Sequence, residues 1–148
     1  MHVVYSNMPC EIKTPHSIFL IGPTPRSPRI ESWRPGAIGF LESAGYDGTI
    51  LVPEPFVDYK RQIEWEYAGT EAATVLAAWV PRKMDNMPGL TTNVEFGLYV
   101  RSGKLIYGRP AWAEKCRYLD MVYAREVGKT PHDTLESLLA EAMRWRRP

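Results

Sequence analysis

Short apolar runs alternate with helix-like segments along these 148 residues, and this alternation restricts the possible folds more than any other feature. Each run stops at a glycine or a proline, as a buried parallel strand does where the chain turns into a loop. Strands that alternate with helices at this spacing predict a three-layer α/β fold with a mostly parallel sheet. The predicted strands are residues 18–21, 49–52, 74–80 and 104–107.

Five segments carry helical signals. The first begins at a Ser32 cap with Pro35 in its first turn, and the last begins at a Thr130 cap with Pro131 at its first position. In the second helix, Glu64 and Glu66 are expected to face solvent. The other predicted helices are residues 59–71, 93–101 and 112–127.

The first seventeen residues give a weaker signal. Residues 2–5 can form a short edge strand, but Pro9 and Pro15 favour an extended lead-in over most of residues 1–17. No other candidate for a fifth strand is visible. Because the chain has no internal repeat and no linker, we expect a single domain over residues 1–148.

Composition excludes several classes of function. Eighteen basic and seventeen acidic residues leave a net charge of +1, which does not favour binding to a nucleic acid polymer. Two cysteines favour a reduced, cytoplasmic setting, and residues 1–13 lack the apolar core of a signal peptide. No apolar run approaches the length of a membrane span.

Familiar cofactor and nucleophile motifs are missing as well. The dinucleotide-binding glycine motif, the phosphate-binding P-loop and the serine-hydrolase elbow are absent. The three histidines, at positions 2, 16 and 132, are scattered along the chain and predict no metal site. We therefore expect no cofactor, and carboxylate chemistry remains.

The best-placed carboxylate is Glu95. It follows the glycine- and proline-containing loop after the third predicted strand, and such loops border the ligand crevice of an open α/β sheet. A structural interpretation competes with this one, because Thr92 to Glu95 also fits a capping box. At a helix N-terminus the carboxylate would be kept ionised by the helix dipole, which suits a nucleophile that attacks an anomeric carbon.

Other residues at strand ends are candidates for binding a substrate. Arg26, like Arg29, can meet an anion or lie exposed on a rigid turn, and Glu54 can hold a hydroxyl group or be a surface carboxylate. Trp79 can stack on a planar base, although a single tryptophan more often packs in the core. The turn after the first predicted strand, which is expected to form the pocket floor, contributes Gly22, Pro23 and Thr24.

Three stretches together resemble the nucleoside 2-deoxyribosyltransferase-like proteins. They are Ile18–Arg26, Trp79–Arg82 and above all Gly89–Gly97, which holds an Asn-x-Glu-Phe-Gly core. The resemblance implies a flavodoxin-like fold with a parallel sheet of about five strands and Glu95 as the nucleophile. It also implies homo-oligomers, dimers or larger, whose active sites take residues from a neighbouring chain.

The sequence departs from this family at three positions. Gly89 stands where the well-studied branch has a catalytic aspartate, residues 79–82 lack its base-binding aspartate, and residues 18–21 lack its tyrosine. Asp85 is the nearest carboxylate that can replace a lost one. The identity of the base-protonating group therefore stays open.

The leading expectation is transfer of a 2-deoxyribosyl group between nucleobases. Glu95 would be the nucleophile, Asn93 and Glu54 would lie near the sugar, and Thr92 would line the pocket. The partners would be a nucleoside or nucleotide and a free nucleobase. Hydrolysis of the same bond in a nucleoside or its 5′-monophosphate is the first alternative, and a non-catalytic nucleotide-binding module is the second.

Overall fold

The computed structural model describes residues 1–56 and 58–146, and it has an all-parallel sheet of five strands between two layers of helices. This agrees with the predicted flavodoxin-like, three-layer fold. The strands are β1 (His2–Tyr5), β2 (Ser17–Ile21), β3 (Thr49–Val52), β4 (Val75–Trp79) and β5 (Leu105–Gly108). The helices are α1 (Arg34–Ser43), α2 (Tyr59–Ala72), α3 (Leu90–Tyr99), α4 (Arg117–Val127) and α5 (Leu135–Arg144).

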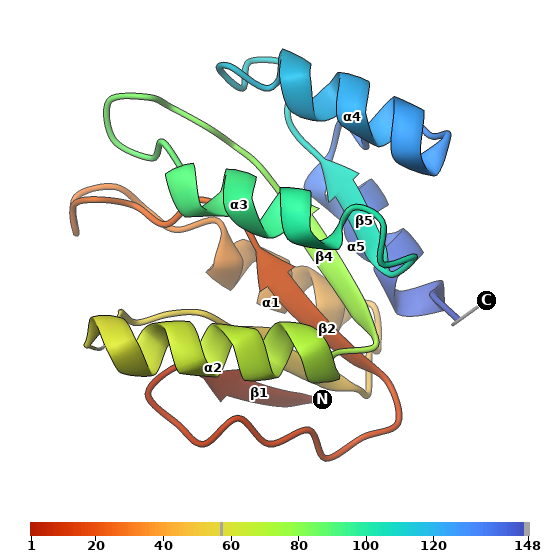
Figure 1. Ribbon diagram of the computed structural model, residues 1–148. Helices are drawn as coiled ribbons and strands as arrows, with labels where there is room; N and C mark the ends of the chain where they lie inside the picture. Colours follow the sequence, from red (N-terminus) through yellow and green to blue (C-terminus); the bar gives the residue numbers. More distant parts are fainter. Residues whose placement is uncertain (57, 147–148) are drawn as a thin grey trace.

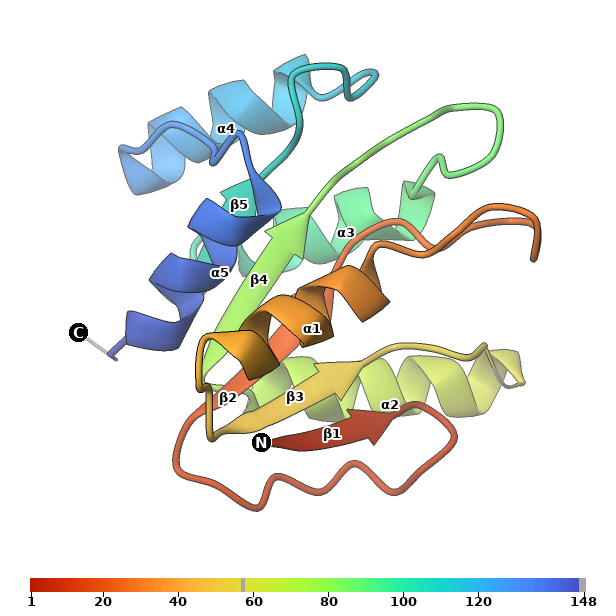
Figure 2. The same ribbon diagram turned by 180° about the vertical axis from the view of Figure 1, so that it is seen from behind.

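The strands lie in the order β1-β3-β2-β4-β5. Helices α2 and α3 cover one face of the sheet, as Figure 1 shows, and α1 and α5 cover the other, which faces the viewer in Figure 2. Alternate residues of each strand serve the two layers. Phe19 and Ile21 pack toward α2, α3 and α4, whereas Ile18 and Leu20 pack toward α1 and α5.

The fifth strand comes from the N-terminus. Residues 2–5 pair in parallel with residues 49–52 at the edge of the sheet, so the predicted edge strand is confirmed. At the opposite edge, beyond β5, an isolated bridge forms between Gly108 and His132. The chain therefore completes its sheet with an N-terminal strand.

Three predicted helix starts are wrong. α3 begins at Leu90 after Gly89, which has a φ of 58°, and no side chain caps it, so Thr92 is not the cap. α5 begins at Leu135, and the Thr134 side chain, rather than that of Thr130, accepts the capping hydrogen bond. α4 begins at Arg117, several residues after the predicted start. A left-handed glycine cap leaves no Ser/Thr pattern in the sequence, which explains the error at α3.

Candidate functional site

A cavity of about 300 Å³ lies at the carboxyl end of the sheet. The loops after β2 and β4, α2 and the beginning of α3 all contribute to its lining. The chain passes from β2 to β3 on one side of β2, and from β3 it crosses to β4 on the other side. The cavity therefore lies at a topological switch point, the usual ligand site of an open α/β sheet. Figure 1 shows these loops at the same end of the molecule as the beginnings of α2 and α3.

A fully buried arginine, Arg34, organises one wall. Its guanidinium donates to the carbonyl oxygens of Gly22, at 2.7 Å, and Leu20, at 3.3 Å. It also donates to the Thr24 hydroxyl at 3.1 Å and to the Glu54 carboxylate at 2.6 Å. Burial lowers the pKa of Arg34, but Glu54 opposes this shift and arginine stays charged in proteins. The first turn of α1 therefore places a fixed positive charge beside the cavity.

Two glycines let the loops after β2 and β4 approach each other. A Cβ atom on Gly22 would lie 2.1 Å from the carbonyl oxygen of Trp79. A Cβ atom on Gly89 would lie 2.8 Å from the Pro23 ring, and the φ of Gly89 is left-handed. Gly22 and Gly89 both line the cavity, and the ring of Pro23 packs against Gly89.

Glu95 lines the cavity, but from the second turn of α3 and not from the first. The capping-box interpretation is therefore wrong, because the helix begins five residues before Glu95. Burial, and then the nearby Glu66, raises the pKa of Glu95 to about 8, while Arg34 lowers it. The expectation that the helix dipole keeps this carboxylate ionised is also wrong, since Glu95 lies beyond the first turn of the helix and burial disfavours its charge.

A second carboxyl group, Glu66 of α2, lines the same cavity. The buried Gln62, one turn earlier, donates its side-chain amide to Glu66 Oε1 at 2.7 Å and to the carbonyl oxygen of Pro53 at 3.2 Å. Burial raises the pKa of Glu66, and Gln62 and Arg34 oppose that shift. The prediction that Glu66 faces solvent is corrected by this position.

Facing α2, the first turn of α3 gives the cavity a rim suited to an anion. Leu90, Thr91 and Thr92 line the cavity, and no side chain caps this helix. Arg26 also lines the cavity and is exposed. Uncapped N–H groups at a helix start attract negative charge, and a neighbouring arginine adds to that attraction.

Five predicted site residues lie outside the cavity lining, and one of them is Pro23, which packs against Gly89. Trp79 is buried in the core between the sheet and α5, so its position does not support base stacking. Asn93 accepts a hydrogen bond from the buried Arg82, and Asp85 is exposed in the turn between Lys83 and Met87. Glu54 is bound to Arg34 and to the Ser32 hydroxyl, which favours a role in holding Arg34.

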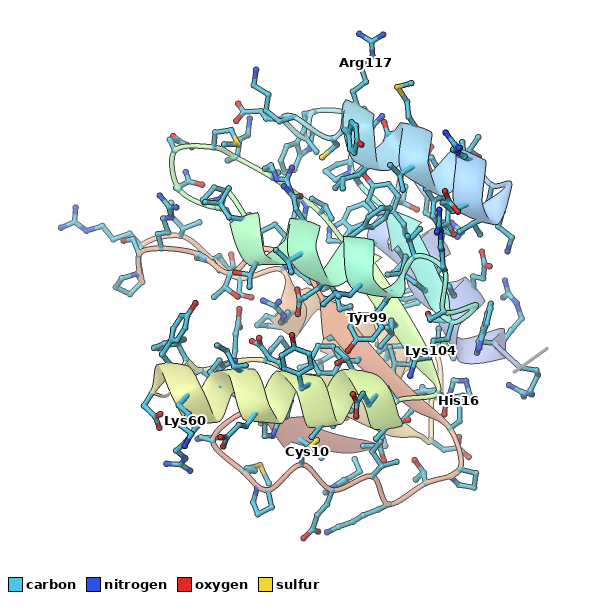
Figure 3. All side chains as sticks on the ribbon, viewed as in Figure 1. Cys10, His16, Lys60, Tyr99, Lys104 and Arg117 are labelled. Atoms are coloured by element: carbon cyan, nitrogen blue, oxygen red, sulfur yellow. The ribbon has the colours of Figure 1, made fainter. Side chains whose placement is uncertain are left out.

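Sequence reasoning missed Arg34 and misplaced Glu66. Arg34 was missed because a hydropathy pattern treats an arginine as a surface residue. A signal for Glu66 was present, because Gln62, Glu66 and Thr70 recur at four-residue spacing and form a polar stripe on α2. At the far end of this stripe the Thr70 hydroxyl meets the hydroxyl of Tyr99 at 2.8 Å, and Figure 3 shows Tyr99 between α3 and α2.

No protein-family model matches the sequence, and no curated protein matches it either. Within residues 1–56 and 58–146, none of the helices is long and apolar enough to cross a membrane. The same parts of the chain contain no group of three or more histidine, cysteine, aspartate or glutamate side chains arranged to hold a metal ion. The residues that line the cavity are therefore the structural basis for assigning a function.

Proposed function

We propose that this protein is a nucleoside 2-deoxyribosyltransferase, which moves a 2-deoxyribosyl group from one nucleobase to another. The observation that carries the proposal is the position of Glu95, whose carboxyl group lines a cavity at the switch point of a parallel sheet. The resemblance of residues 89–97 to the transferase-like proteins supports the same role for this residue.

The reaction needs a carboxylate beside C1′ of the sugar. Glu95 attacks C1′ as the bond to the nucleobase breaks, through an oxocarbenium-like transition state, and a covalent glycosyl ester forms. A second nucleobase then attacks C1′, which releases Glu95 and retains the configuration. The carboxyl groups of Glu66 and Glu95 both line the cavity, and an ionised carboxylate close to the sugar stabilises the positive charge that develops there.

Exchange of bases tests the proposal directly. The protein is incubated with a 2′-deoxynucleoside, with and without a free acceptor base, and a transferase forms the new nucleoside only when the base is present. Glu95→Gln is expected to lose this activity, while Glu64→Gln, on the exposed side of α2, keeps it. If the parent protein turns over no nucleoside or nucleotide, the proposed enzymatic activity is refuted. A non-catalytic nucleotide-binding module then remains.

A covalent intermediate gives a second test. Brief exposure to a 2-fluoro-2-deoxy nucleoside analogue is expected to add one sugar to the intact protein, because the fluorine slows release of the ester more than its formation. Peptide mapping by mass spectrometry should place the sugar on Glu95. A sugar on another residue would contradict the assignment of the nucleophile.

Hydrolysis of a nucleoside 5′-monophosphate is a second candidate function. The uncapped start of α3 and the exposed Arg26 favour a phosphate at the rim of the cavity. Arg26→Ala is then expected to raise KM for the monophosphate and to leave KM for the nucleoside unchanged, with Arg29→Ala, outside the lining, as the matched control. Water as the acceptor would release free sugar phosphate without an added base.

We also propose that the enzyme is a homo-oligomer that acts in the cytoplasm. A groove between α2 and α3 adjoins the cavity and shares Glu66 and Glu95 with it. Exposed apolar side chains border this groove, among them Tyr67, Val94 and Leu98. Light scattering is expected to give at least a dimer for the parent protein and a monomer for Leu98→Glu. Met121→Glu on α4 is the control and should behave as the parent.

The two unpaired cysteines suit the proposed cytoplasmic location, because the cytoplasm is a reducing compartment.

A further inference from the structure

Two helices present carboxyl groups to the same cavity. Glu66 comes from α2 and Glu95 from α3, and these helices lie side by side on one face of the sheet (Figure 1). Among the described residues that line the cavity, these are the only two carboxyl groups. The cationic residues of the lining, Arg26 and Arg34, cannot give up a proton at neutral pH.

The Glu66 side chain is held in position by Gln62, which lies one turn earlier on α2. The Gln62 amide bridges Glu66 Oε1 to the carbonyl oxygen of Pro53, directly after β3. Because Gln62 is buried, this bridge ties the Glu66 side chain to the end of the sheet. A surface glutamate in an exposed helix face needs no such support, so the arrangement favours a function for Glu66 in the cavity.

Building on the transferase proposed above, we propose that Glu66 is the acid and base of the reaction. As Glu95 bonds to C1′, the C1′–N bond breaks, and the electron pair moves to the leaving base, which takes a proton from the Glu66 carboxyl group. In the second half the acceptor base gives a proton to the Glu66 carboxylate as its nitrogen bonds to C1′. The C1′–O bond to Glu95 breaks in the same step, and both side chains return to their starting states.

Burial around the cavity supports Glu66 as a source of a proton. It raises the pKa of both carboxyl groups, and Glu66 raises that of Glu95 further. A raised pKa keeps the Glu66 carboxyl group protonated closer to neutral pH, as a general acid requires. Neither exposed Asp85 nor Glu54, which is bound to Arg34, has a comparable position.

The leaving group provides the decisive test. Glu66→Gln retains an acceptor for the Gln62 hydrogen bond, so the variant is expected to fold. With an ordinary 2′-deoxynucleoside its kcat should fall by roughly 100-fold or more, the usual contribution of a general acid. With a 7-methylated purine deoxynucleoside, whose base leaves without a proton, the loss of sugar–base cleavage should be less than about threefold.

Azide tests the second half of the reaction. Azide needs no base to remove a proton, so it should restore turnover of the methylated substrate by Glu66→Gln and yield a glycosyl azide of retained configuration. Glu64→Gln, two residues away on the exposed side of α2, should behave as the parent protein in both experiments.

The outcomes separate the two proposals. Equal losses on both substrates, or no loss on either, would overturn the role of Glu66 even when the parent protein transfers sugars. If the parent protein forms no glycosyl ester and turns over no nucleoside, the proposed transferase function is refuted, and the role of Glu66 is refuted with it. If Glu66→Gln loses kcat on the ordinary substrate and keeps sugar–base cleavage of the methylated substrate, the transferase function and the role of Glu66 are both supported.

Discussion

Replacing Glu95 with glutamine is expected to stabilise the protein at neutral pH. Burial raises the pKa of this carboxyl group from the ordinary 4.5 to about 8. Between these values the folded protein keeps the proton that the unfolded chain has lost, so the free energy of unfolding falls by about 1.4 kcal/mol per pH unit. At pH 7 the accumulated loss is at most about 3 kcal/mol, and Glu95→Gln removes it.

The size of this stability difference depends on pH. Below pH 4.5 both states hold the proton and the loss vanishes, whereas above about pH 8 both states are ionised and the loss is complete. Urea unfolding of the parent and of Glu95→Gln across this window measures the difference, with Glu64→Gln as an exposed control. A difference that stays constant from pH 4.5 to pH 8 would show that Glu95 titrates normally and would refute the reasoning.

Four further substitutions, two beside the cavity and two near the start of α5, are tested by urea unfolding. Arg34→Met should cost about 3–5 kcal/mol, because it leaves buried acceptors without their donor; a loss below about 1 kcal/mol would contradict this. Gly22→Ala should cost about 1–3 kcal/mol or more, because its Cβ would lie 2.1 Å from the Trp79 carbonyl oxygen; a neutral result would argue against this tight contact. Thr134→Ala should cost about 1 kcal/mol and Thr130→Ala should be near neutral; the reverse order would restore the cap predicted from the sequence.

The order of strands and helices was predictable from the sequence because hydrophobic burial determines it. Apolar runs of four to seven residues must be covered on both faces, and only parallel strands between helices provide that cover. The edge strand at residues 2–5 was harder to predict, because it is short and only one of its residues, Val4, is buried. Its partner, residues 49–52, gives no local sign that a strand will pair there.

Positions within the site were less predictable, because they depend on contacts between distant segments. The start of α3 depends on the left-handed conformation of Gly89, which packs on Pro23 from another loop. The inward position of Glu66 depends on Gln62 reaching Pro53, and the burial of Arg34 depends on carbonyl groups at the end of β2. Local patterns of caps and charges carry no information about such partners.

The charges around the cavity connect stability with the proposed chemistry. Glu54, Glu66 and Glu95 all raise the pKa of Arg34, and burial raises the pKa of Glu66 and Glu95. The burial that raises the pKa of Glu95 also strengthens the attraction between its carboxylate and an oxocarbenium-like sugar. The cost of Glu95 to the folded protein at neutral pH and its proposed role in the transition state therefore have the same physical origin. We therefore expect Glu95→Gln to be more stable than the parent protein at neutral pH and to be inactive.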